Sequence, residues 1–200
     1  MKYIKTLGLL AIAVMALTAV IGTASASAAA KFTAGKVGVF LEDTTLSEHV
    51  LTITGSPVKC STTDFSGSTE ALESTTLRLS PSFFGCTAFG FSATVTNSGC
   101  TYILWANGLF DLSTVCKLTI SVNNVFAKCT AVITGQFSVG SVSYTNGAGD
   151  IVIKFNANSV KDEVTQSSGL CPLTVGTHTN ASYTGESTVK ASGTTLSRDA

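Results

Sequence analysis

Hydrophobic and polar residues alternate along most of the chain after residue 30. The clearest runs are short, are rich in Thr, Ser, Val and Phe, and cover residues 49–54, 75–80, 91–96 and 151–157. A period of two residues gives an extended strand one apolar and one polar face, whereas an amphipathic helix needs a period near 3.6. Gly, Asn, Ser or Pro bounds each run, as is typical of turns between strands. The pattern therefore predicts strands and no helix of useful length.

Two dipeptides predict tight hairpins, Asn107-Gly108 and Asn146-Gly147, because both residue types tolerate the positive φ of such turns. The spacing of runs and turns, with no alternating helices, predicts an all-β fold: a single antiparallel β-sandwich or barrel of about 10–13 short strands. No linker, charge block or fixed-period repeat interrupts residues 31–192, which we expect to form one β-rich domain. Residues 193–200 read as a polar C-terminal tail.

The first 28 residues have a different pattern. Lys2 and Lys5 precede an apolar run that ends near Ile21, and a stretch of Ala and Ser with A-x-A spacing follows it. A positive start, an apolar run and small residues are the three parts of a secretory signal peptide. An uncleaved anchor is the alternative, but the run is short for a span of roughly 20 residues. We predict that residues 1–28 are removed and that the mature protein is secreted and extracellular.

The net charge of the mature chain limits the classes of molecule that it can bind. Without the signal peptide, ten basic residues stand against twelve acidic ones, a net charge of about −2. This balance gives no basic surface for nucleic acid or for anionic lipid. We therefore expect neither nucleic acid nor, after signal cleavage, a membrane as partner. A cell-wall glycan or another surface protein fits the composition, and no motif indicates a cofactor.

The six cysteines all follow the signal peptide. An even number of cysteines in an exported chain predicts three disulfides. A zinc site is the alternative, but it requires closely spaced pairs such as C-x-x-C, and none is present. The predicted disulfide cysteines are Cys60, Cys86, Cys100, Cys116, Cys129 and Cys171.

Strand register favours particular pairs, because a cross-strand disulfide joins residues that oppose one another in a hairpin. Pairing Cys116 with Cys129 keeps both on one apolar face and leaves a four-residue loop, residues 121–124. The competing pair, Cys100 with Cys116, needs an odd loop centred on Gly108; a two-residue Asn-Gly turn would place Cys100 on the wrong face. We therefore predict the pairs Cys116–Cys129, Cys60–Cys86 and, by elimination, Cys100–Cys171.

Several short stretches resemble those of a known family. They are residues 58–60, 85–91, 99–102, 142–146 and 169–172, in this order. The chain resembles an uncharacterised family of small six-cysteine secreted β-rich proteins of high-GC Gram-positive soil bacteria. The resemblance implies export, the cysteine framework and the β-rich fold over nearly the whole mature chain. It implies no particular activity.

Catalytic signals are weak. His49 and His178 are the two histidines, and either could serve a Ser-His-acid site, but no G-x-S-x-G elbow is present. We expect both to be surface residues at strand edges. The acidic residues are scattered, so no pair of facing carboxylates for glycoside hydrolysis can be identified from spacing. We predict no catalytic, cofactor-binding or metal-binding residue.

Aromatic residues are densest around Cys86. Clustered aromatic side chains on a β-sandwich can stack against sugars or line an apolar pocket, although most such clusters are core. If any patch binds a ligand, we expect this one. Its residues are Phe83, Phe84, Phe89, Phe91, Tyr102 and Trp105.

Two functions remain open at this point. The first is a non-enzymatic extracellular binding or structural module that presents loops on a disulfide-fixed scaffold. The alternative is a secreted hydrolase that acts on polysaccharide or peptidoglycan. A deep cleft holding two acids, or a serine hydrogen-bonded to His49 or His178, would favour the enzyme. A flat or loop-rich surface with neither would favour the module.

Overall fold

The computed structural model describes residues 29–199, of which 77% lie in strands and none in a helix. The prediction of an all-β fold is thus confirmed, whereas the predicted signal peptide, residues 1–28, lies outside the described residues. The strands are β1 (Lys31–Ala34), β2 (Phe40–Ile53), β3 (Ser56–Ser68), β4 (Glu73–Ser74), β5 (Thr76–Ala88), β6 (Phe91–Ser92), β7 (Thr94–Asn97), β8 (Tyr102–Trp105), β9 (Leu109–Asn123), β10 (Ala127–Asn146), β11 (Asp150–Gly169), β12 (Gly176–Ala191) and β13 (Leu196–Asp199).

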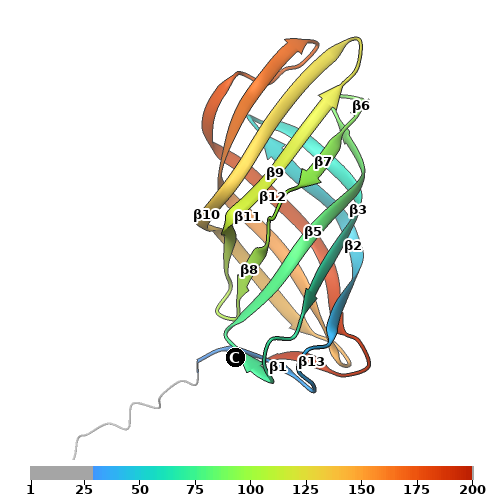
Figure 1. Ribbon diagram of the computed structural model, residues 1–200, viewed down its shortest axis with the longest axis vertical. Coiled ribbons are helices and arrows are strands. Elements are labelled where there is room, and N and C mark those ends of the chain that lie inside the picture. Colours follow the sequence, from blue (N-terminus) through green and yellow to red (C-terminus); the bar gives the residue numbers. More distant parts are fainter. Residues whose placement is uncertain (1–28, 200) are drawn as a thin grey trace, which may run out of the picture.

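Eight strands close into an antiparallel up-and-down barrel (Figure 1). Around the barrel their order is β2, β3, β5, β8, β9, β10, β11 and β12, and the last strand pairs with the first. The short strands β7 and β8 both pair with β9 and share the space between β5 and β9. Of the two predicted architectures, the barrel is correct and the sandwich is wrong. Pairing of β12 with β2 leaves the main sheet no long free edge.

The main strands are longer than the short strands that we predicted; β10 and β11 have 20 residues each. Along β11, Ile153, Phe155 and Ala157 are buried and the residues between them are exposed, as expected for a strand with one face toward a core. The register of β11 against β12 then shifts between Ala157 and Val160. Such a bulge interrupts the alternation without ending the strand. A long bulged strand therefore looks like two short ones in the sequence.

Aromatic side chains fill the barrel interior. Phe65, Tyr102, Phe110, Phe155 and Tyr183 pack with ring centroids 4.9 to 6.4 Å apart, the range of favourable edge and offset contacts. A void of about 10 Å³ remains beside them, which is room for about one water molecule. The interior beside these rings is therefore a packed core.

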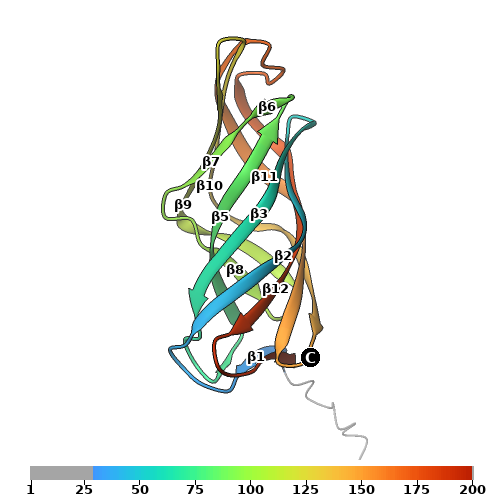
Figure 2. The ribbon, with the colours of Figure 1, turned by 90° about the vertical axis from the view of Figure 1, so that its right-hand side faces the viewer.

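A second sheet lies at one end of the barrel, where β1 pairs with both β13 and β4 (Figures 1 and 2). Phe32 packs edge-on against Tyr144 of the barrel, and Leu196 is buried. Arg198 donates from Nε to the carbonyl of Ala106 at 2.7 Å. Residues 193–200 were expected to be a polar tail, but residues 196–199 form strand β13, which pairs with β1 at this end of the barrel. We call this end the base.

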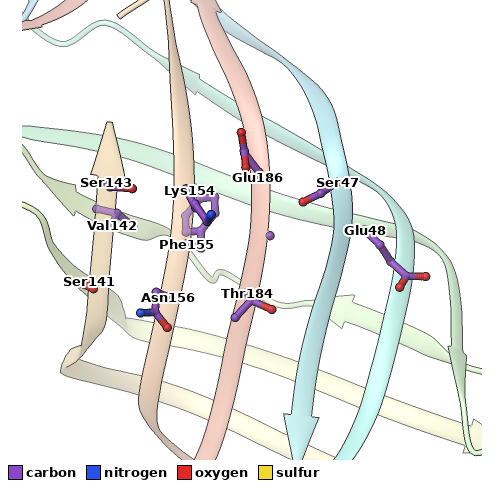
Figure 3. Close-up of a pocket in the computed structure, with 11 residues that line it drawn as sticks. Ser47, Glu48, Ser141, Val142, Ser143, Lys154, Phe155, Asn156, Thr184 and Glu186 are labelled. Carbon is purple, nitrogen blue, oxygen red and sulfur yellow. The ribbon is translucent and has the colours of Figure 1, made fainter. Parts of the chain in front are cut away.

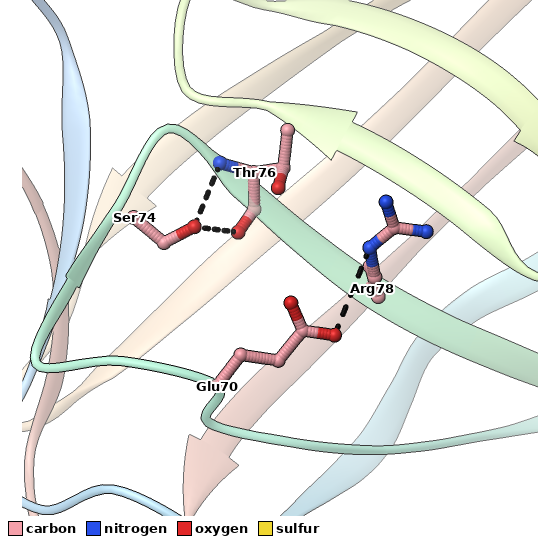
Figure 4. A network of polar contacts seen from close by, with 4 residues as sticks. All are labelled: Glu70, Ser74, Thr76 and Arg78. Atoms are coloured by element: carbon pink, nitrogen blue, oxygen red, sulfur yellow. Dashed lines mark hydrogen bonds and ion pairs between the residues drawn. The ribbon is translucent and has the colours of Figure 1, made fainter.

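Side-chain contacts fix the corner between β4 and β5 (Figure 4). The hydroxyl of Ser74 accepts from the backbone N–H of Thr76 at 3.1 Å and donates to its carbonyl at 2.8 Å. Nearby, Arg78 lies 3.7 Å from a carboxylate oxygen of Glu70. The hydroxyl replaces backbone pairing that the corner interrupts, as serine often does in turns. β5 can therefore leave the base and enter the barrel wall without losing these hydrogen bonds.

Three disulfides cross-link neighbouring parts of the barrel wall, as the cysteine count predicted. Cys60 of β3 and Cys86 of β5 are direct partners across the sheet, and this predicted pair is confirmed. Two predicted pairs are wrong: Cys116–Cys129 and Cys100–Cys171. The bonds in their place are Cys100–Cys116 and Cys129–Cys171.

Cys129 does not meet Cys116 because the β9–β10 turn comes later in the chain than residues 121–124. The side chain of Asn124 accepts from the backbone N–H groups of the second and third residues after it and so builds the turn. β9 continues to Asn123, and Cys129 lies opposite Val122. Its sulfur bonds instead to Cys171, just beyond β11.

Cys100 meets Cys116 because the β8–β9 turn has an odd number of residues and β9 is irregular after it. Leu104 pairs with Phe110, so the turn is centred on Asn107 and not on Gly108, which adopts a φ of 93°. This register alone would set Cys100 opposite Thr114, and the irregularity of β9 between Leu112 and Lys117 brings Cys116 to it. The Asn-Gly pair therefore does not form the two-residue turn on which the predicted register depended.

Disulfides are typical of proteins that fold in oxidising compartments. Between residues 29 and 199, no helix is long and apolar enough to cross a membrane. The three disulfides agree with the expected export of the chain.

Candidate functional site

A groove of about 700 Å³ crosses the outer face of four neighbouring strands, β10, β11, β12 and β2 (Figure 3). Outward-facing side chains from all four strands line it. They are Ser47, Glu48, Ser141, Ser143, Lys154, Asn156, Thr184 and Glu186. Its volume lies within the range of small-molecule binding sites, about 300–1,000 Å³. We call this surface the groove.

Bulges shape the groove. The register of β12 against β2 shifts on both sides of Glu186, and bulged strands bend and twist more strongly than regular ones. Gly185 forms part of the floor and faces the barrel interior, where a Cβ atom would overlap the ring of His49. Only glycine therefore lets β12 lie this close to the imidazole.

The groove presents mostly uncharged hydrogen-bonding groups: four hydroxyls and the amide of Asn156. Lys154 and Glu186 add one charge of each sign and are direct neighbours across β11 and β12. Within residues 29–199, neither takes part in an ion pair, whereas Glu48 lies 3.2 Å from Lys59. A ligand in the groove would therefore find free donors and acceptors of several kinds.

A buried polar cluster lies directly beneath the groove. His49 is 1% exposed; its Nδ1 lies 2.6 Å from the hydroxyl of Tyr183 and its Nε2 lies 3.2 Å from that of Ser187. Burial lowers the pKa of His49 to about 4, so the ring is neutral at pH 7. Burial also raises the pKa of Asp43 to about 6, against the lowering effect of a 2.6 Å hydrogen bond from the backbone N–H of Phe65.

The expectation that both histidines are surface residues is wrong for His49. Its position in the alternating run carried the signal, because His49, Leu51 and Ile53 fall on one face. Its contact with Ser187 is a serine–histidine hydrogen bond of the kind that hydrolases use. However, Ser187 is fully buried, so no substrate can reach its hydroxyl in this conformation.

His178 is half-buried and lies across from Asp162 in the β11–β12 register. Its Nε2 donates to the carbonyl of Thr174 at 2.8 Å. Asp162 is buried and its carboxylate has no hydrogen-bond partner in the described part of the chain. No serine forms a hydrogen bond with His178 there, and its one bonded partner is a backbone carbonyl.

The structure does not bring the six residues of the expected aromatic patch together. Phe83 and Tyr102 are buried in the barrel interior, whereas Phe84 points outward from the same strand as Phe83 and is 52% exposed. Trp105 is half-buried near the base, where its indole N–H donates to Asp111 at 2.7 Å.

The other two members of that patch, Phe89 and Phe91, lie at the β5–β6 turn and pack against the edge of the core. Strand β6 lies toward the end of the barrel opposite β8, the strand that ends at Trp105 (Figure 1). Clustering along the sequence did not become clustering in space, because alternate residues of a strand face opposite sides.

Sequence reasoning missed the groove. Its side chains come from four strands, and Ser and Thr occupy outward positions throughout the chain, so nothing in the sequence marks these in particular. Among the described residues, no group of three or more His, Cys, Asp or Glu side chains is arranged to hold a metal ion.

No protein-family model, no curated protein and no solved structure matches this chain. The resemblance to six-cysteine secreted proteins therefore stays a prediction.

Proposed function

We propose that this chain is an exported extracellular binding module and that it holds a glycan in the groove on β10, β11, β12 and β2. The observation that carries the proposal is the lining of the groove: hydroxyl and amide groups, with one unpaired charge of each sign, on a concave surface of about 700 Å³. Sugars present many hydroxyls that donate and accept hydrogen bonds, and such a lining can satisfy them.

The scaffold supports this function because it fixes the groove before the ligand arrives. The lining residues stand on the middle of long paired strands, above a core of packed rings. A rigid site loses little conformational entropy on binding, which favours affinity.

Export is the second part of the proposal, and the disulfides support it. We expect a secreting host to release a mature product that begins between Ser27 and Lys31. N-terminal sequencing of the protein from the medium measures this. A membrane-bound product that keeps Met1 would contradict export.

Glycan binding can be tested on a glycan array and with isolated cell walls. We expect the double variant Lys154→Ala/Asn156→Ala to lose at least tenfold in affinity, because each side chain offers hydrogen bonds to the ligand. Lys161→Ala/Asn158→Ala is the matched control, since it changes the same residue types on the same strand outside the groove. Equal losses in both variants, or no binding by the unchanged protein, would contradict the proposal.

One observation favours the alternative, a secreted polysaccharide hydrolase: two carboxylates, those of Glu48 and Glu186, line the groove. Paired carboxylates are the usual machinery of glycoside hydrolysis. Glu48 is paired with Lys59, which leaves Glu186 as the more available acid. If the protein cleaves a polysaccharide and Glu186→Gln abolishes turnover while binding remains, the hydrolase is the correct function.

A further inference from the structure

Three exposed apolar side chains meet at the end of the molecule farthest from the base. Val125, Phe126 and Leu170 are 90%, 64% and 66% exposed. Val125 and Phe126 form the β9–β10 turn, and Leu170 follows β11; its N–H donates to the carbonyl of Phe126 at 2.8 Å. Figures 1 and 2 show that these strands reach beyond the other hairpins at this end. We call this projection the apolar tip.

Several backbone groups of the apolar tip are already hydrogen-bonded within the protein. The side chain of Asn124 accepts from the N–H groups of Phe126 and Ala127 at 2.8 and 2.9 Å. The N–H of Asn124 donates to the carbonyl of Ala127 at 3.0 Å, and the carbonyl of Phe126 accepts from Leu170. Moving a free backbone group out of water costs several kcal/mol. These groups avoid most of that cost, so the tip can leave water.

The tip is also held in one shape. The Cys129–Cys171 disulfide joins its two sides just behind the exposed residues. Gly169 has a φ of 67°, and a Cβ atom there would overlap the carbonyl of Phe126. Only glycine therefore allows this close approach of the two segments. Because the tip is ordered beforehand, little conformational entropy is lost when something covers it.

The nearest charged residue to the apolar side chains along the chain is Lys128, two positions after Phe126. Residues 121–127 and 164–177 contain no Asp, Glu, Lys or Arg, and Asn, Gln, Ser and Thr surround the apolar side chains. A small apolar point with a polar collar that carries the single charge of Lys128 matches the profile of the membrane interface, where apolar groups enter the acyl boundary and polar or basic groups meet the headgroups.

The size and shape of the tip point to lipid instead of protein. The three side chains expose on the order of 400 Å², about half of the roughly 800 Å² that each partner contributes to a stable protein interface. A second copy of this chain would bring the same small convex surface and could not enclose the tip. A bilayer adapts to a convex insertion and needs no complementary pocket.

We propose that the apolar tip inserts into the interfacial region of a lipid bilayer with uncharged or zwitterionic headgroups. Val125, Phe126 and Leu170 enter the acyl boundary, and the polar collar lies among the headgroups. This proposal departs from the expectation of no membrane partner, which rested on net charge. Burial of the apolar side chains of the tip in lipid does not require a charged protein surface. The proposal is independent of glycan binding in the groove.

The test is co-sedimentation of the mature protein with phosphatidylcholine vesicles. We expect measurable partitioning of the unchanged protein that falls at least tenfold in Phe126→Ser/Leu170→Ser. The matched control is Phe40→Ser/Leu72→Ser, which removes the same residue types at the base, where they are 76% and 53% exposed. This control should partition like the unchanged protein, and raising the salt concentration should leave partitioning unchanged.

Three results would overturn the proposal. They are no partitioning of the unchanged protein, equal losses in the tip and base variants, and partitioning that disappears in high salt. Sedimentation of the free protein adds a fourth: a dimer that the tip substitutions dissociate would show that a second copy covers the tip. Circular dichroism of each variant verifies that the comparison is between folded proteins.

Discussion

Acidification should destabilise the barrel through His49. The unfolded chain takes up a proton on this side chain as the pH falls through 6.5, but burial lowers the pKa in the folded state to about 4. Between these values the unfolded state binds more protons than the folded state, so stability falls as the pH falls. The contribution is complete above pH 6.5 and is lost by about pH 4. A difference of about 2.5 in pKa corresponds to about 3 kcal/mol.

Asp43 acts in the opposite direction. Its pKa is raised to about 6 in the folded state, so the folded protein takes up this proton first and gains stability as the pH falls below 6. The two effects offset each other in the total free energy of unfolding. The informative quantity is therefore the difference between the unchanged protein and His49→Gln, because both keep Asp43.

Urea unfolding at pH values from 7 to 4 measures this difference. We expect the advantage of the unchanged protein over His49→Gln to shrink by about 3 kcal/mol across that range. Ser187→Ala is the control: it removes one hydrogen bond from Nε2 but keeps the imidazole, so its pH dependence should follow that of the unchanged protein. An advantage over His49→Gln that does not vary with pH would refute the reasoning.

Three further predictions concern the core and the cross-links. Gly185→Ala should lower the free energy of unfolding by about 2 kcal/mol or more, measured by thermal unfolding, because the new methyl group overlaps His49. In a double-mutant cycle with His49→Ala, the two losses should be less than additive. Asp43→Asn should stabilise the protein at pH 8 but not at pH 5, because burial penalises only the charged form of the Asp43 carboxyl group. Equal effects on stability at both pH values would contradict this. Replacing Cys129 and Cys171 by Ala should cost about 4 kcal/mol, from the separation of 42 residues, and non-reducing peptide mapping should find this pair in the unchanged protein.

The fold class could be predicted from the sequence because alternation is a local property. In β11, for example, Ile151, Ile153 and Phe155 fall on one face, and that face is the core. Strand pairing could not be predicted as well, because it depends on turns and bulges that involve distant residues. The side chain of Asn124 moves one turn by a few residues, and Cys129 then lies opposite Val122 instead of Cys116.

The candidate site was less predictable than the fold. Ser141, Lys154 and Thr184 lie far apart in the sequence and meet only because the barrel aligns β10, β11 and β12. Their residue types are also common on the outside of any exposed sheet. His49 is the exception: its place in the apolar alternation with Leu51 indicates burial, although we expected a surface residue.

Closure of the barrel has a consequence for the order of folding. The other pairings in the barrel wall join strands that are close along the chain, but β12 and β2 pair across almost the whole described length, as between Leu41 and Ala191. No disulfide crosses this seam. Because closing a long loop carries the largest entropy cost, contacts of this kind form late and limit the folding rate. His49 on β2 bonds to Tyr183 and Ser187 on β12, so the neutral imidazole joins the two strands that meet last.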